Sequence, residues 1–341
     1  MRRIVAGAVA LAAIVFMLAL FQPFKGDGGE AVSVSIPKQA GVGEIADILA
    51  DRDVISSATL FEVRATLGGD RGDLKPGVYE LRKDMSYGDA IDRLVKGPSR
   101  RIIQLTIPEG LSRREVAPLA GRAGVTGDYV RASADASVLD TRRYGLQKDP
   151  ESLEGFLFPA TYELRSGASA ASLVRRQLAA FDDTLAQVDQ SYARRKNLTT
   201  FDVVTIASMV EREAQQPRER KLVAAVIYNR LKQGIPLGID ATIRYATGNW
   251  QQPLTQSQLA TDSPYNTRTN AGLPPGPIGN PGLASLQAAA RPARVGYLYY
   301  VVKPGTCGEH AFSSTSAQFE RDRQRYNEAR DAAGGNSPTK C

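Results

Sequence analysis

Two glutamates, Glu211 and Glu213, stand at the end of the most apolar helical segment of the chain, TTFDVVTIASMVEREA at residues 199–214. At about 100° per residue, Glu211 projects over a small apolar face, whereas Glu213 falls on the opposite side with Asp202. A carboxyl group among apolar side chains keeps its proton more readily, and a general acid needs that proton. Glu211 is therefore the predicted acid and Glu213 is predicted to face solvent. The alternative for Glu211 is an ion pair with a nearby arginine.

Four further side chains are candidates for substrate binding: Asp240, Tyr265, Asn266 and His310. Asp240 precedes a short helical pattern, where it could equally serve as the N-cap. Tyr265 and Asn266 come just before a stretch rich in proline and glycine, GLPPGP, which predicts a rigid loop. Asn266 could instead bond to its own turn, and His310, beside a strand pattern, could be structural.

Histidine and cysteine are scarce, with one histidine and two cysteines in 341 residues. A disulfide framework and a Cys/His zinc cluster are therefore excluded, and any Ser or Cys triad would have to use His310. A disulfide between Cys307 and Cys341 stays open. No metal and no cofactor are expected.

Composition is that of a globular protein, with 43% hydrophobic and 23% charged residues. The formal net charge of +7 suits anionic surroundings such as acidic lipid or an acidic wall polymer. Basic residues do not cluster with aromatic ones, so no nucleic-acid partner is expected.

The N-terminus combines Arg2 and Arg3 with an uncharged apolar run from Ile4 to Phe21. In a helix this run covers roughly 27 Å, close to the hydrocarbon thickness of a bilayer. Arginines before the run predict a cytoplasmic N-terminus and a single-pass anchor in the cell membrane, with the rest of the chain extracytoplasmic. A cleaved signal peptide is the alternative.

The fold class predicted from the patterns is α+β. The expected division is a cytoplasmic start and transmembrane signal-anchor (1–25), a small β-α-α-β module (31–101), a middle helical region (102–200), a catalytic region (201–333) and a mobile tail (334–341). The order and size of the module resemble the LysM-like modules that bind wall glycan. The segment LEGFLFPATYEL at 153–164 could line a sugar cleft or form a core between domains.

Several motifs in order resemble the endolytic peptidoglycan transglycosylases of the MltG or YceG-like family: ASMVEREA, VAAVIYNRL, LGIDATIRY, SPYNTRTNAGLPPGPIGNPG and LYYVVKPGTCGEHAFS. The resemblance implies that Glu211, the first glutamate of V-E-x-E, is catalytic. It departs from the family where Gly238 replaces a glutamine and Ala160 an aspartate, which puts any sugar contact of that glutamine in doubt.

The resemblance implies a lyase that cleaves the bond from N-acetylmuramic acid to N-acetylglucosamine in nascent peptidoglycan and so limits glycan strand length. One carboxyl group would protonate the glycosidic oxygen and then help the muramic acid 6-hydroxyl to close on C1, giving a 1,6-anhydro end. Membrane-bound peptidoglycan synthases (penicillin-binding proteins) are implied as partners. Two alternatives stay open: a hydrolytic muramidase in which Asp240 activates water, and a scaffold that binds glycan without cleaving it.

Overall fold

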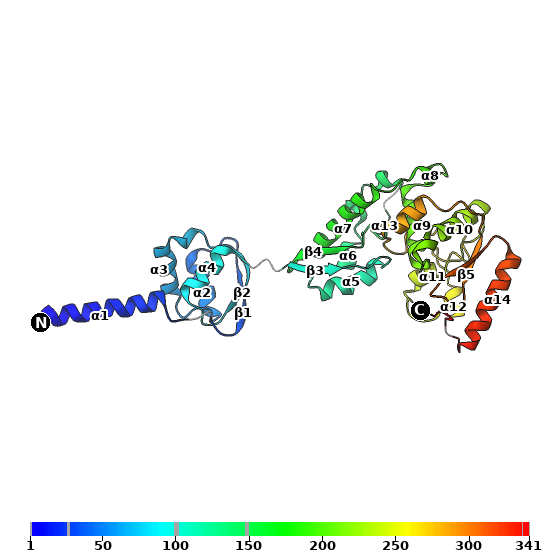
Figure 1. Cartoon of the computed structure of the whole chain (residues 1–341). Helices are drawn as coiled ribbons and strands as arrows, with labels where there is room; N and C mark the ends of the chain where they lie inside the picture. Colours follow the sequence, from blue (N-terminus) through cyan, green and yellow to red (C-terminus); the bar gives the residue numbers. More distant parts are fainter. Residues whose placement is uncertain (1, 26–27, 99–101, 147–149, 336, 341) are drawn as a thin grey trace. The chain divides into compact units, whose positions relative to one another are not determined.

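The computed structural model describes the chain except residues 1, 26–27, 99–101, 147–149, 336 and 341. The chain divides into two compact units, Met1–Arg101 (unit 1) and Ile102–Cys341 (unit 2). Helices and two-stranded antiparallel sheets build both units (Figure 1), in agreement with the α+β prediction.

Unit 1 has the expected strand-helix-helix-strand order, with one helix before it and one after. Strands β1 and β2 pair antiparallel from Ala31↔Arg82 to Ile36↔Gly77. Alternate residues such as Val34 and Tyr79 point into the core, as the period of a half-buried strand requires. The elements are α1 (Arg2–Phe21), β1 (Ala31–Ile36), α2 (Val42–Asp51), α3 (Ala58–Gly68), η1 (Asp70–Gly72), β2 (Gly77–Arg82) and α4 (Tyr87–Lys96).

Helix α1 spans the apolar run at the N-terminus and contacts α3 and α4, with the side chain of Leu20 buried. Among the helices that the structure describes, none is both long enough and apolar enough to cross a membrane. This finding differs from the transmembrane segment expected from the sequence.

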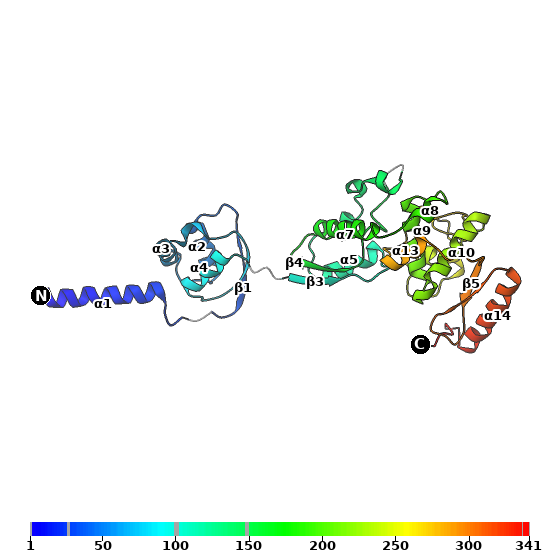
Figure 2. The same cartoon turned by 45° about the horizontal axis from the view of Figure 1, so that its top comes forward.

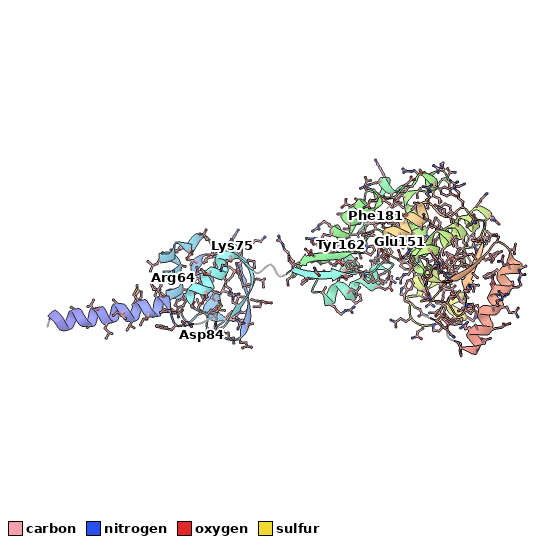
Figure 3. The ribbon with its side chains drawn as sticks, viewed as in Figure 1. Arg64, Lys75, Asp84, Glu151, Tyr162 and Phe181 are labelled. Carbon is pink, nitrogen blue, oxygen red and sulfur yellow. The ribbon has the colours of Figure 1, made fainter. Side chains whose placement is uncertain are left out.

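The first part of unit 2 is a two-stranded sheet covered by helices. Strands β3 and β4 pair antiparallel from Ile102↔Arg165 to Thr106↔Thr161. The motif LEGFLFPATYEL leads into β4 and is core: the Phe156 ring lies 4.9 Å from Tyr144 and 5.2 Å from Phe181. Figure 3 labels Phe181 and, on β4, Tyr162. The elements are β3 (Ile102–Thr106), α5 (Arg113–Arg122), α6 (Tyr129–Ala132), η2 (Ala136–Val138), η3 (Thr141–Tyr144), β4 (Thr161–Arg165), α7 (Ala170–Leu185) and α8 (Ser191–Arg194).

Helix α9 (Thr200–Glu213) contacts α10 (Arg220–Gln233), α11 (Asp240–Thr247) and α13 (Leu283–Ala290), and Figure 2 shows α10 and α13 beside it. Thr199 and Asp202 form a capping box, so the helix begins where the sequence predicts. Every residue from Val203 to Val210 is buried, as expected for a helix that is apolar nearly all round. The buried Ser208 hydroxyl accepts a hydrogen bond from Ile278 N–H (3.0 Å), which attaches the proline-rich loop to this helix.

The last part of unit 2 is a β-hairpin flanked by a long helix. Strands β5 and β6 pair antiparallel, and α14 packs on both strands. The elements from α9 onward are η4 (Pro217–Glu219), α10 (Arg220–Gln233), α11 (Asp240–Thr247), α12 (Gln256–Leu259), α13 (Leu283–Ala290), β5 (Tyr299–Val302), β6 (His310–Ser313) and α14 (Ser316–Ala332).

The C-terminal segment contacts the turn between β5 and β6. Backbone hydrogen bonds join Gly305 N–H to Pro338 O (2.9 Å) and Lys340 N–H to Thr306 O (3.0 Å), in a tail for which the sequence predicts mobility. Cys307, in the same turn, is disulfide-bonded. Cys341, the other cysteine of the pair that the sequence left open, lies outside the described residues.

Candidate active site

Glu211, the acid predicted from the sequence, lies in a packed ion pair. One of its carboxylate oxygens accepts a hydrogen bond from Gly282 N–H (2.9 Å), and the other contacts the Arg220 guanidinium (3.3 Å). The side chain is only 6% exposed, and Arg220 also donates to the Ser285 hydroxyl (3.2 Å). Both oxygens of Glu211 are thus occupied by protein partners, which is the alternative that the sequence left open.

Glu109 adds a second carboxyl group to this ion pair. Burial and the Glu211 charge raise the pKa of Glu109, and the charge of Arg220 opposes them. A Cβ on Gly282 would lie 1.9 Å from a Glu109 carboxylate oxygen. The chain segments that carry Glu109, Glu211 and Gly282 are therefore in close contact. Glu109, Glu211, Arg220 and Gly282 thus form one closely packed cluster, which we call the junction.

Glu213 occupies a different environment from the solvent-facing one predicted. Its carboxylate accepts a hydrogen bond from the Tyr300 hydroxyl (3.0 Å) on β5, and it lies next to the start of α11. Burial raises the pKa of Glu213; the Tyr300 bond lowers it, and the Asp240 charge raises it again. The helical periodicity of α9 could not predict these contacts of Glu213. They come from β5 and α11, which lie later in the chain and cover the side of α9 that the sequence pattern assigns to solvent.

Asp240 lies beside Glu213, but it is not the N-cap of α11, a position that Ile239 takes. One Asp240 carboxylate oxygen accepts hydrogen bonds from Arg268 Nε (2.9 Å) and Nη2 (2.6 Å). The side chain is 47% exposed, so substrate can reach it. Gly238, two residues before Asp240, has φ +62°, a backbone conformation that favours glycine. This conformation fits the glycine that stands here in place of the family's glutamine.

His310 is buried beneath this cluster. Its Nδ1 lies 2.7 Å from Glu219 Oε2, its backbone N–H donates to Glu219 Oε1 (3.0 Å), and its ring packs edge-on against Tyr300 at 5.2 Å. These contacts fix β6 and Tyr300 to the start of α10. The His310 side chain is 5% exposed, so its contacts are with Glu219 and Tyr300.

Asn266 is also structural. It is 1% exposed, and its Nδ2 donates to Leu259 O (3.1 Å) and Thr261 O (2.9 Å) while its Oδ1 accepts from Arg268 N–H (3.1 Å). The side-chain polar atoms of Asn266 are therefore all bonded to the chain around Arg268.

Tyr265 lines a separate cavity of about 450 Å³, formed by α5, α11 and the loops that face them. Its ring lies 5.0 Å from the ring of Tyr245. The structure thus brings Glu213, Asp240 and His310 together, and it places Tyr265 at the cavity and Glu211 at the junction.

Glu154 and Asn280 were not predicted as functional residues, yet they join the loops around that cavity. The Glu154 carboxylate is 4% exposed and accepts hydrogen bonds from Arg113 N–H (3.0 Å), Asn280 Nδ2 (3.0 Å) and the Tyr245 hydroxyl (3.3 Å). Asn280 Oδ1 accepts from Gly155 N–H (2.9 Å). The sequence signal that could have identified Glu154 is its position within an aromatic run. A carboxyl group buried among aromatic side chains needs hydrogen-bond partners.

Burial raises the pKa of Glu154 from 4.5 to about 7, which predicts a pH-dependent stability. Between these two pKa values the folded state holds a proton that the unfolded state releases, so stability falls as pH rises from about 4.5 to 8. We expect the free energy of unfolding to fall by about 3 kcal/mol through this window from Glu154 alone. Urea unfolding of the wild type and of Glu154→Gln at several pH values measures the difference; parallel curves would contradict it.

The described residues contain no group of His, Cys, Asp and Glu side chains that could hold a metal ion. The candidate site contains carboxyl, phenol and guanidinium groups. With such groups the site can donate a proton, stabilise positive charge and bind hydroxyl groups.

Comparisons with known proteins agree on one family. The family model described as the YceG-like family matches residues 34–325. The chain is 30% identical over 329 residues to the endolytic murein transglycosylase of Bacillus subtilis (strain 168), covering 92% of this chain and 90% of that protein. It is 32% identical to the endolytic murein transglycosylase of Streptococcus pneumoniae (strain D39), of which it spans 57%.

A solved structure agrees with these sequence matches. The crystal structure of a yceG-like protein from Listeria monocytogenes superposes with a TM-score of 0.58 at 30% identity, covering 86% of this chain and 99% of that one. The chain belongs to the YceG-like family.

Proposed function

We propose that the protein is an endolytic murein transglycosylase in which Glu213 is the general acid and base. The observation that carries this proposal is geometric: the Glu213 carboxyl group accepts a hydrogen bond from the Tyr300 hydroxyl and lies next to Asp240, whose side chain is 47% exposed. Glu211, the acid that the family resemblance implies, is the alternative; both of its oxygens bond to protein partners in this structure. The names of the relatives from Bacillus and Streptococcus support the reaction class.

The reaction begins with proton transfer from Glu213 to the glycosidic oxygen between N-acetylmuramic acid and N-acetylglucosamine. The bond from C1 to that oxygen breaks, and the leaving sugar keeps the proton as its hydroxyl group. The ionised Glu213 then takes the proton of the muramic acid 6-hydroxyl as its oxygen bonds to C1. This closure gives a 1,6-anhydro end, returns Glu213 to its acid form and consumes no water.

The other residues of the site assist Glu213. The Tyr300 hydroxyl orients its carboxyl group, and His310 with Glu219 supports Tyr300. The negative charge of Asp240 is placed to stabilise positive charge that develops on the sugar as the bond breaks. In a muramidase, Asp240 would instead activate water.

Digestion of purified glycan strands, with products identified by mass spectrometry, tests the reaction. Anhydro ends support the transglycosylase. Reducing muramic acid ends would show the muramidase, and strands that bind but stay intact would show a scaffold.

The pH dependence of cleavage tests the assignment of Glu213. Cleavage requires the protonated acid, so kcat/KM falls as pH rises through its pKa. Asp240→Asn removes a charge that raises this pKa, so we expect the alkaline limb to move to lower pH. Tyr300→Phe removes a hydrogen bond that lowers it, so the limb should move to higher pH. Shifts of the same sign in both variants would contradict the assignment.

We also propose that α1 attaches the protein to the cell membrane, with the rest of unit 1 and all of unit 2 outside the cytoplasm. Support comes from the two arginines before the apolar run and from exposed apolar side chains along α1, such as Val9, Leu11 and Ile14. Protease digestion of intact and lysed spheroplasts tests it: resistance in intact spheroplasts would contradict an external location.

Unit 1 is proposed to bind wall glycan as a LysM-like module, on the support of its strand-helix-helix-strand order and antiparallel pair. Peptidoglycan synthases are proposed partners, because attachment to the membrane would bring the site to newly made strands. Pull-down of unit 1 on purified peptidoglycan tests the first proposal, and crosslinking in cells tests the second.

A further inference from the structure

The cavity beside Tyr265 is separate from the Glu213 site. It lies between the start of α5, the loop before β4, the start of α9 and the end of α11. Neither Glu213 nor Asp240 lines it. The proposed chemistry therefore leaves this cavity without a role.

The floor of the cavity is held in place by hydrogen bonds. Glu154 bonds to Arg113, Asn280 and Tyr245 from three separate segments. The Tyr245 and Tyr265 rings pack against each other, and Pro277 closes one wall. A floor fixed in this way is pre-formed for a ligand and loses little entropy on binding.

The wall of the cavity carries two charges of opposite sign that have no partner in the part of the chain that the structure describes. Arg114 and Glu151 are both exposed, and neither makes a hydrogen bond or ion pair with any residue that the structure describes. Arg113 differs, because its guanidinium donates to Val130 O (2.6 Å). Burial of Tyr265 raises its pKa to about 12, and the negative charge of Glu151, which Figure 3 labels, adds to this rise.

A ligand for this cavity should carry both a carboxylate and an amine, with apolar atoms between them. A neutral glycan has neither charge and would leave Arg114 and Glu151 unpaired. The stem peptides of peptidoglycan carry carboxylates and, on their diamino acid, an amine. We propose that the cavity binds a stem peptide of the strand being cleaved, with Arg114 on a carboxylate and Glu151 on the amine.

This inference rests on the proposed function, and helix α11 relates the two sites. Asp240 begins α11 beside Glu213, and Tyr245 on the same helix lines the cavity. Five residues of helix separate them by roughly 7.5 Å. A strand bound at Glu213 can therefore place a peptide branch in the cavity, so the enzyme would select strands that still bear peptides.

Paired substrates test the selection: glycan strands with their stem peptides and the same strands stripped by an amidase. We expect the double variant Arg114→Ala/Glu151→Ala to lower kcat/KM on peptide-bearing strands by about fivefold, through KM, and to leave stripped strands unchanged. Arg122→Ala, an exposed arginine on α5 outside the cavity, is the matched control. Equal losses on both substrates would show that the cavity holds sugar rings, and no loss would also overturn the proposal.

Binding distinguishes failure of this inference from failure of the proposed function. Calorimetry of the full chain carrying Glu213→Gln, with a soluble stem tetrapeptide released by amidase, needs no cleavage. Suppose that the wild type cuts neither substrate, that the tetrapeptide binds, and that the double variant weakens this binding. The proposed reaction is then wrong and the cavity assignment stands. No binding of the tetrapeptide overturns the cavity assignment.

Discussion

Replacing Glu213 with glutamine is expected to lower kcat for strand cleavage by about a thousandfold, because the same carboxyl group gives and then takes a proton. Glutamine keeps an oxygen that can accept the Tyr300 hydrogen bond, so the fold should survive. Initial rates on purified strands, with thermal unfolding of both proteins, separate lost chemistry from lost structure.

Glu211→Gln is the matched control, two residues away on the same helix. It breaks the ion pair with Arg220 but can keep the bond from Gly282 N–H, so we expect a stability loss of about 3 kcal/mol. Cleavage by the folded fraction should stay within about tenfold of the wild type, below the effect of a lost general acid. The opposite ranking, with Glu211→Gln folded and inactive and Glu213→Gln active, would restore Glu211 as the acid.

Gly155→Ala is expected to destabilise unit 2 by about 4 kcal/mol, from left-handed backbone strain and overpacking together. Gly155 has φ +88°, and a Cβ there would lie 2.4 Å from Pro277 Cγ and 2.9 Å from Val204 Cγ1. The proline-rich loop thus packs directly on the LEGFLFPATYEL motif and on α9. Chemical unfolding measures the change.

Gly124→Ala is the control for the backbone contribution. Gly124 has φ +83°, but a Cβ there would meet nothing within 4 Å. We expect about 1 kcal/mol of destabilisation, from conformational strain alone. Equal losses in the two variants would show that the close approach of the loop contributes nothing.

The elements that carry the site could be predicted from the sequence because their signals are local. The capping box of Thr199 and Asp202 set the start of α9, and the unbroken apolar run predicted its burial. The strand-helix-helix-strand order of unit 1 followed from short periodic patterns ended by glycine and proline. The family was also visible, since its motifs lie in order along the chain.

The surroundings of each of the two glutamates were decided only by tertiary structure. The helix determined that Glu211 and Glu213 point in different directions, but the chain segments that meet each of them come from far along the sequence. Arg220 and Gly282 occupy Glu211, while Tyr300 and α11 enclose Glu213 beside Asp240. A carboxyl group's proton affinity depends on its solvation and on neighbouring charges, and both are set by packing rather than by local sequence.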